Sequence, residues 1–359
     1  MDTKEEQFLY NLSNVDGIAG HEQEVREIFK EEAKKYTSDI EFDGLGSVVA
    51  RYGEKGPKVL MASHMDEVGF MVTNITDKGF IEFQTVGGWW AQVMLAQQVT
   101  ITTRKGDKIQ GVTGSKPPHV LTAEVRNKVY DIKDMFIDLG MSSKEEVEAL
   151  GIRPGDMITP RIEATRLNGG KFLLGKAWDN RIGTAIVLKV LENLAQENPV
   201  ENQLYLGANV QEEVGLRGAQ TLTHKVNPAI AFAVDTGTAG DTPGMTPKEA
   251  DSVLGKGPQI LIFDATMIPH QKLINFVTDI ADELNIPYQY TVIAGGGTDA
   301  GRMHLSHDGI PSLAVTVPVR YLHSHTSMIH EDDYLNTVKL LTEVARRLDD
   351  EAVKEILSY

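Results

Sequence analysis

The stretch Gln203-Leu-Tyr-Leu-Gly-Ala-Asn-Val210, followed at once by Gln211-Glu-Glu-Val-Gly215, decides the fold. Its first part is mostly apolar and bounded by polar residues, which predicts a buried β-strand. Glu212 and Glu213 therefore come directly after the end of a strand, where open α/β sheets bind their ligands. A solvated acidic turn would be the better explanation of a lone Glu-Glu pair. The interpretation thus depends on the residues at the ends of the other strands.

Helical and strand patterns alternate on both sides of this stretch. Further strands are predicted over 58–63, 229–234, 288–293 and 312–317, and helices over 22–36, 182–194, 269–284 and most of 333–356. Strands that alternate with helices favour an α/β fold, with a mostly parallel central sheet and helices on both faces.

The pattern changes between about Gly69 and Arg166. Short β-type runs succeed one another there, over 70–75, 80–86, 98–103 and 108–113, with glycine and proline turns between them. Such runs are typical of a small barrel or sandwich. We expect one α/β domain formed by residues 1–68 and 167–359, interrupted by an inserted β-domain of residues 69–166. A length of 359 residues also favours two domains.

The amino-acid composition limits the possible metal ligands and partners of the chain. The chain has no cysteine, so any metal must be held by His, Asp and Glu. A net charge of −16 argues against a nucleic-acid partner, because phosphate binding needs a basic surface. The polar start Met1-Asp-Thr-Lys-Glu5 is unlike a signal peptide, and no apolar run has the length of a membrane span. We therefore expect a cytoplasmic protein with no membrane partner.

Charged or histidine clusters accompany the predicted strands. They are His64 and Asp66 after 58–63, Asp179 just before helix 182–194, Glu212 and Glu213 after 203–210, Asp235 after 229–234, and His323 after 312–317. This gathers His, Asp and Glu side chains at one edge of one sheet, as a borderline divalent ion such as Zn²⁺, Co²⁺ or Mn²⁺ requires. A single catalytic zinc takes fewer protein ligands, whereas two ions sharing a carboxylate would use the set.

Several of these residues have alternative interpretations. Asp66 is better explained as a partner of the His64 imidazole than as a ligand. His325 would face the same side as His323 in an extended segment, so spacing leaves both open as ligands. The segment 295–301, Gly-Gly-Gly-Thr-Asp-Ala-Gly, lacks the P-loop lysine and the Rossmann spacing, and favours a strand-to-helix turn close to a ligand. The remaining histidines are interpreted as cap, loop or surface residues.

The motifs that carry these residues resemble those of the M42 family of dinuclear metalloaminopeptidases. They are Ser-His-Met-Asp-Glu-Val-Gly at 63–69, Gly-Lys-Ala-Trp-Asp-Asn-Arg-Ile-Gly at 175–183, Gln-Glu-Glu-Val-Gly-Leu-Arg-Gly-Ala at 211–219, Ala-Val-Asp-Thr-Gly at 233–237, the glycine-rich segment at 295–301, Gly-Ile-Pro-Ser at 309–312 and Pro-Val-Arg-Tyr-Leu-His-Ser at 318–324. The tail at 320–333 is most similar to the glutamyl aminopeptidase branch. Many relatives have proline where this chain has His325, which favours His323 as the ligand.

The resemblance implies a role for each site residue. One ion would be held by His64 and Asp235, and the second by Glu213 and His323. Asp179 would bridge the two ions, Glu212 would be the general base, and Asp66 would orient His64. Zinc or cobalt would be the metals.

The resemblance also implies substrates and partners. Short peptides would lose N-terminal residues, with a preference for Glu or Asp. An acidic preference needs a cation in the specificity pocket, for which Arg302 is a candidate. Members of the family assemble, so we expect a homo-oligomer, for which a tetrahedral dodecamer is one form, with the inserted β-domain 69–166 making dimer contacts.

Other functions remain open from the sequence. They are an aminopeptidase of broader or neutral specificity, a metal-dependent hydrolase of another bond such as a deacylase or glycanase, and a non-catalytic metal-binding assembly protein. A glycosidase would use paired carboxylates and leave His64 and His323 without a role. A scaffold would have no need of Glu212 as a base.

Overall fold

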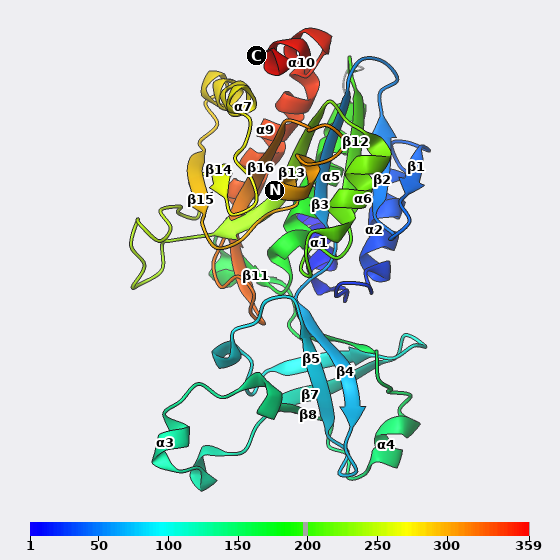
Figure 1. Cartoon of the computed structure of the whole chain (residues 1–359), viewed down its shortest axis with the longest axis vertical. Helices are drawn as coiled ribbons and strands as arrows, with labels where there is room; N and C mark the ends of the chain where they lie inside the picture. The colour runs from blue at the N-terminus through cyan, green and yellow to red at the C-terminus, as the bar shows by residue number, and fades with distance from the viewer. Residues whose placement is uncertain (197–199, 359) are drawn as a thin grey trace.

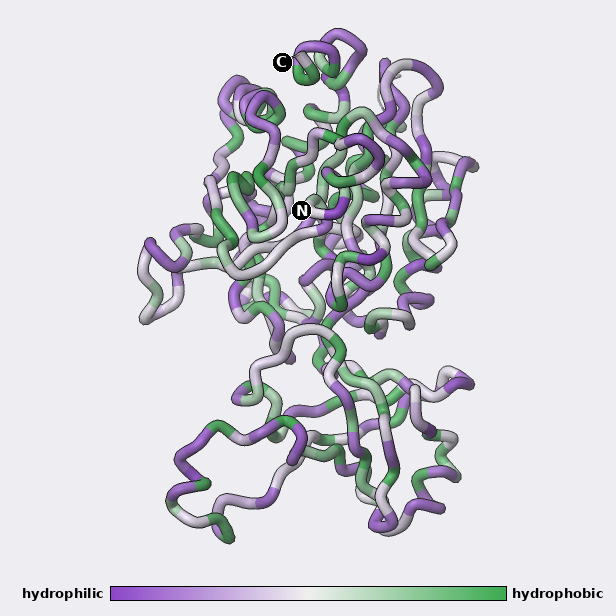
Figure 2. Tube along the Cα trace, in the orientation of Figure 1, coloured by the Kyte–Doolittle hydropathy of each residue, from purple (hydrophilic) through white to green (hydrophobic). Residues whose placement is uncertain are grey.

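The structure of the chain is a computed structural model, which describes residues 1–196 and 200–358. Two bodies are joined by a narrow waist (Figure 1), an α/β body that contains both termini and a smaller β body. Apolar stretches of the chain run through the interior of each body (Figure 2). The expected fold class is confirmed.

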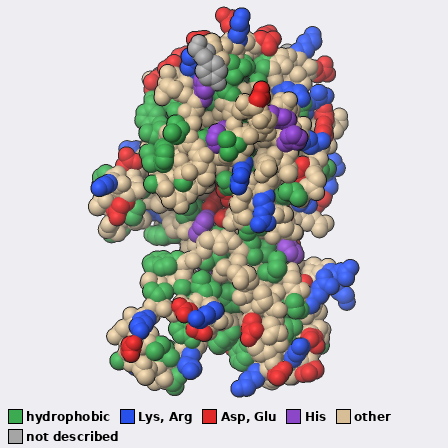
Figure 3. All heavy atoms as spheres, viewed as in Figure 1, with side chains coloured by type: hydrophobic (Ala, Val, Ile, Leu, Met, Phe, Trp, Pro, Cys, Tyr) green, Lys and Arg blue, Asp and Glu red, His purple; other side chains and the backbone are tan. Residues whose placement is uncertain are grey.

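Charged side chains of both signs are spread over the two bodies on the face that Figure 3 shows. The surface narrows between the bodies there, and acidic side chains are visible just above the waist. No helix in the described ranges combines the length and the apolar character needed to cross a membrane.

An eight-stranded sheet forms the centre of the α/β body. Its order is β1 (Ile40–Phe42), β2 (Val48–Tyr52), β12 (Gln203–Asn209), β3 (Lys58–His64), β13 (Ile230–Thr238), β16 (Ser312–Val319), β14 (Gln259–Asp264) and β15 (Gln289–Ile293). The four strands from β12 to β16 are mutually parallel. They are almost completely buried, which explains why they are apolar without alternation.

Helices cover both faces of this sheet. On one face are α1 (Thr3–Asn14), α2 (Gln23–Ala33), α5 (Trp178–Gln196), α7 (Gln271–Glu283), α9 (Glu331–Arg347) and α10 (Asp350–Leu357), around the larger apolar core. On the other face are α6 (Arg217–Val226) and the short α8 (Ala300–Met303). The central helix α5 is buried along most of its length, so it anchors the residues at its start.

The β body is a closed barrel between residues 69 and 160. Its strands are β4 (Gly69–Ile75), β5 (Ile81–Val86), β8 (Phe136–Asp138), β7 (Lys108–Gly114), β6 (Gln98–Thr102) and β9 (Met157–Pro160), in that order around the barrel. It has an apolar core of its own, which includes Phe70, Val99, Ile101 and Ile158. The short helices α3 (Ala123–Arg126) and α4 (Lys144–Ala149) lie in its connections.

Three features differ from the patterns in the sequence. Strand β13 extends to Thr238, so Asp235 lies within a strand and not after one. Helix α5 begins at Trp178, although Asp179 and Asn180 have non-helical dihedral angles. A small sheet of β10 (Thr165–Arg166), β11 (Phe172–Gly175) and β17 (Ser327–His330), which the sequence did not predict, lies at the waist.

Candidate metal centre

The candidate ligands come from the carboxyl ends of the parallel strands. His64 is the last residue of β3, and its neighbours in the sheet are β12 and β13. Glu212 and Glu213 come after β12, and Asp235 lies in β13. The remaining two candidates, Asp179 at the start of α5 and His323 after β16, reach the same point. The sheet therefore brings together residues that are far apart in the sequence.

Asp179 lies between the two histidines. Its Oδ1 is 3.2 Å from His64 Nε2, and its Oδ2 is 3.3 Å from His323 Nε2. One carboxylate thus presents a different oxygen to each imidazole. This arrangement suits a carboxylate shared by two ions.

The other carboxylates divide between the two histidines. Asp235 Oδ1 is 3.6 Å from His64 Nε2, and Glu213 Oε2 is 3.3 Å from His323 Nε2. Three groups have ligand atoms that all lie within 4.8 Å of one another. They are His64 with Asp179 and Asp235, Asp179 with Glu213 and His323, and His64 with Glu212 and Glu213. The first two share Asp179, and the third places Glu212 beside the same centre.

The backbone fixes the tautomer of His64. Its Nδ1 is 3.0 Å from the carbonyl oxygen of Asp66, whereas the Asp66 carboxylate is 3.5 Å away. A carbonyl oxygen only accepts, so Nδ1 carries a proton, and Nε2 is the ring nitrogen that faces Asp179 and the other candidate ligands. The expected orienting contact is therefore made more closely by the main chain of Asp66 than by its side chain.

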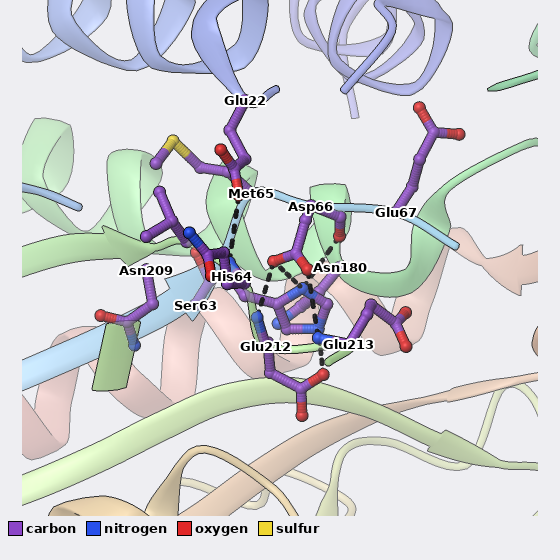
Figure 4. Close-up of polar contacts among 12 residues, drawn as sticks. Glu22, Ser63, His64, Met65, Asp66, Glu67, Asn180, Asn209, Glu212 and Glu213 are labelled. Carbon is purple, nitrogen blue, oxygen red and sulfur yellow. Dashed lines mark hydrogen bonds and ion pairs between the residues drawn. The ribbon is translucent and has the colours of Figure 1, made fainter. Parts of the chain in front are cut away.

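The Asp66 carboxylate holds the Glu212–Glu213 turn (Figure 4). Its two oxygens accept hydrogen bonds from the backbone N–H groups of Glu212, at 3.0 Å, and Glu213, at 3.1 Å. Asp66 is fully buried, which strengthens both bonds. Asp66, which follows β3, thus positions Glu212 and Glu213, which follow the neighbouring strand β12.

Negative charge exceeds positive charge in this cluster. Burial raises the pKa of Glu213 to about 8, with a further contribution from Asp179, and burial and neighbouring acidic groups raise the pKa of Glu212 well above its usual value. Burial disfavours the charged form of Asp179, but hydrogen bonds from His323 and His64 bring its pKa below the usual range. Glu213 Oε1 is buried without a hydrogen-bond partner. Divalent cations would neutralise this charge, and the N/O donor set fits them.

His325 and Arg302 lie outside the cluster. Both ring nitrogens of His325 are buried without a partner, and its ring contacts Trp89 edge-on at a centroid distance of 5.4 Å. Burial lowers its pKa to about 4, so the ring is neutral. Arg302 is exposed on α8.

Two buried acidic residues near the centre were not recognised as site residues from the sequence. Asp299 accepts a hydrogen bond from Asn209 at 2.8 Å, and burial raises its pKa to about 7. Glu22 accepts the backbone N–H of Gln211 at 3.1 Å, directly before the glutamate pair. Asp299 belongs to the glycine-rich segment that the sequence assigned to a turn, so the signal was present there, whereas Glu22 looked like an ordinary helix residue.

A cavity of about 540 Å³ opens onto the cluster. Its lining also includes Glu249 and residues 291–298, which comprise the end of β15 and part of the glycine-rich segment. In the described part of the chain, no lysine or arginine contributes to this lining. The charged residues of this lining other than histidine are therefore all acidic.

The family model for M42 glutamyl aminopeptidase matches residues 46–340, which include every candidate ligand. The chain belongs to the M42 family. It is 39% identical over 353 residues to the glutamyl aminopeptidase of Lactococcus lactis subsp. cremoris, covering 97% of this chain and 98% of that protein. It is 31% identical over 335 residues to the lysyl aminopeptidase of Pyrococcus furiosus, covering 92% and 94%. Two relatives of this chain are thus named after residues of opposite charge, glutamate and lysine.

Solved structures of similar proteins have the same fold. The TET aminopeptidase of the marine sediment archaeon Thaumarchaeota archaeon SCGC AB-539-E09 superposes with a TM-score of 0.96 at 41% identity, over 98% of this chain and 99% of that one. The TET1 peptidase of Pyrococcus horikoshii, described as assembling into a tetrahedron or a large octahedral shell, gives a TM-score of 0.87 at 33% identity, over 96% and 100%.

Proposed function

We propose that this M42 chain is a metal-dependent aminopeptidase that removes N-terminal residues from short peptides. The observation that carries the proposal is the Asp179 carboxylate, whose two oxygens face His64 and His323 separately. His64 and Asp235 would hold one ion, Glu213 and His323 would hold the second, and Asp179 would bridge them. Zinc and cobalt suit this mixed imidazole and carboxylate set.

When bound, a pair of such ions lowers the pKa of a water molecule and polarises the scissile carbonyl. Glu212 is the residue best placed to move the proton. Its Oε2 lies 3.8 Å from His64 Nε2, and the Asp66 carboxylate fixes its backbone. A carboxylate in this place could take a proton from water and pass it to the leaving amine. Asp66 acts through Glu212 and Glu213, so it is a positioning residue.

The cavity lining favours a neutral or basic N-terminal residue. A preference for Glu or Asp would need a cation beside the substrate side chain, and the described lining supplies Glu249 instead. Arg302 does not line this cavity. We therefore favour the broader specificity over the acidic preference that the glutamyl branch suggests.

A panel of aminoacyl-p-nitroanilides tests activity, metal dependence and preference together. We expect EDTA to abolish hydrolysis and Zn²⁺ or Co²⁺ to restore it, with the Leu and Lys derivatives cleaved faster than the Glu and Asp derivatives. Hydrolysis that survives complete metal removal would refute the metal mechanism. Faster cleavage of the Glu derivative would restore the acidic preference.

We also propose that residues 69–166 form an inserted domain through which subunits pair within a homo-oligomer, with a tetrahedral dodecamer as the expected form. Support comes from the separate apolar core of the barrel and from the assembly of the Pyrococcus horikoshii relative. Deleting residues 69–166 and measuring mass by light scattering tests this. A deletion variant of the same subunit number as the full chain would place the contacts in the α/β body.

A further inference from the structure

A second cavity adjoins the metal centre at the waist of the molecule. It has a volume of about 950 Å³ and lies between the barrel side, which contributes residues 90–98 and 161–162, and the α/β body, which contributes residues 238–245 and 320–326. It shares Thr238, Leu322 and His323 with the cavity that holds the candidate ligands. A peptide could therefore occupy both cavities at once, with its scissile bond at the shared boundary.

The two cavities have opposite charge. The charged side chains other than histidine that line the first are all acidic: Asp179, Glu212, Glu213, Asp235 and Glu249. Those that line the second are Arg161 and Arg320, with no carboxylate among the described residues. Arg320 is already paired with Asp241, at 2.6 and 2.7 Å. The charge of Arg161 is thus the one that remains for a ligand.

Arg161 comes directly after strand β9 at the edge of the barrel. Its side chain contacts the Gln98 side-chain oxygen at 3.4 Å, and no ion pair involves it within the described ranges. Trp90, which is 59% exposed, belongs to the same cavity lining. An open guanidinium and an open indole in one cavity are the groups that recognise a carboxylate and an apolar side chain.

We propose that the second cavity binds the part of the peptide beyond the scissile bond, and that Arg161 pairs with the terminal α-carboxylate of a short peptide. This rests on the proposed aminopeptidase function. Arg161 attracts the free carboxylate of a peptide to the second cavity, whereas the described lining of the first cavity has no lysine or arginine, so the charges favour the productive direction of binding. A volume of this size is in the range of cavities that bind small ligands, so it accommodates only a few residues.

The experiment compares neutral peptides of two to six residues as free acids and as C-terminal amides, using the metal-loaded full-length protein. At the length whose end reaches Arg161, we expect kcat/KM for the acid to exceed that for the amide by roughly fivefold, as for a partly exposed ion pair of about 1 kcal/mol. The difference should lie mainly in KM. Longer peptides should lose it, because their carboxylate extends past Arg161.

Substitutions at two arginines complete the test. R161Q should bring the acid-to-amide ratio close to one, and R161K should retain part of it. R104Q, which removes an exposed barrel arginine outside this cavity, should keep the wild-type ratio. Equal rates for acid and amide at every length, or an unchanged ratio in R161Q, would overturn the proposal. Failure of the proposed aminopeptidase function can be told apart from failure of the Arg161 proposal, since the wild type would then hydrolyse no aminoacyl-p-nitroanilide.

Discussion

Replacing Lys176 by Met should destabilise the chain far more than removing a surface lysine. Lys176 is 2% exposed, and its Nζ donates to Asp16 at 2.6 Å and to Glu67 at 2.9 Å. Removing one partner of a buried ion pair costs about 3–5 kcal/mol, because the other charge stays buried without compensation. Arg181 remains 3.1 Å from Glu67, and Lys108 remains 2.9 Å from Asp16. We therefore expect the lower end of that range, about 3 kcal/mol of unfolding free energy.

The loss of unfolding free energy caused by Lys176→Met should grow as the pH rises. Burial raises the pKa of Glu67 in the folded state, although Lys176 and Arg181 oppose the shift. Without Lys176 this pKa rises further. The folded variant then binds a proton that the unfolded chain has released above its own pKa of about 4.3, so its stability falls as pH rises from that value. The loss is therefore smaller at low pH, where Glu67 of the variant binds a proton, and larger at high pH, where it does not.

Urea denaturation at one subunit concentration measures this effect. The matched control is Lys189→Met, since Lys189 is half-buried and pairs with Glu192 at 2.9 Å on the surface of α5. Such a pair contributes below about 1 kcal/mol. Similar losses in both variants, or a Lys176→Met loss that does not change between pH 5 and pH 8, would refute the reasoning.

Further predictions concern the metal centre and the junction beside it. Glu212→Gln should lower kcat by roughly 10²–10⁴-fold with metal content unchanged, because the amide cannot accept a proton; loss of metal by mass spectrometry would make Glu212 a ligand. His323→Ala should lose one ion and most activity, whereas His325→Ala should keep both ions; equal metal loss would contradict the assignment. Asp16→Asn should flatten the acid side of the stability profile, measured by urea midpoints from pH 6 to pH 3. Burial raises the pKa of Asp16, but Lys176 and Lys108 more than offset this and hold it below its usual value, so the stability it contributes is present above pH 4 and lost as pH falls.

The positions of the candidate ligands could be predicted because they are determined by the sheet. Apolar runs identify buried strands, parallel strands end at one edge, and the residues just beyond those ends must therefore meet. This holds for His64 and the Glu212–Glu213 pair, which the structure places at one centre. Asp235 meets them although its strand is longer than its apolar run indicates.

Which of His323 and His325 faces the candidate ligands could not be predicted in this way. Side chains two residues apart share a face only if the backbone is extended. Here Tyr321 and His323 have positive φ angles of 62° and 53°, so the alternation is broken. His323 points to Asp179, and His325 is buried beside Trp89. Left-handed dihedral angles at tyrosine and histidine leave no pattern in the sequence.

The junction between the barrel and the α/β body was also invisible in the sequence, because its contacts join residues that are far apart along the chain. Asp16 accepts hydrogen bonds from Thr159 of β9, at 2.6 Å, and from Lys108 of β7, at 2.9 Å. It also accepts from Lys176, which lies three residues before Asp179. One buried carboxylate thus links two barrel strands to the segment that carries the shared candidate ligand. A change in the orientation of the barrel would move Asp16 and Lys176 together, and it would reach Asp179 through a short stretch of backbone that is itself buried. The barrel is therefore connected to the candidate metal centre through the hydrogen bonds of one buried carboxylate.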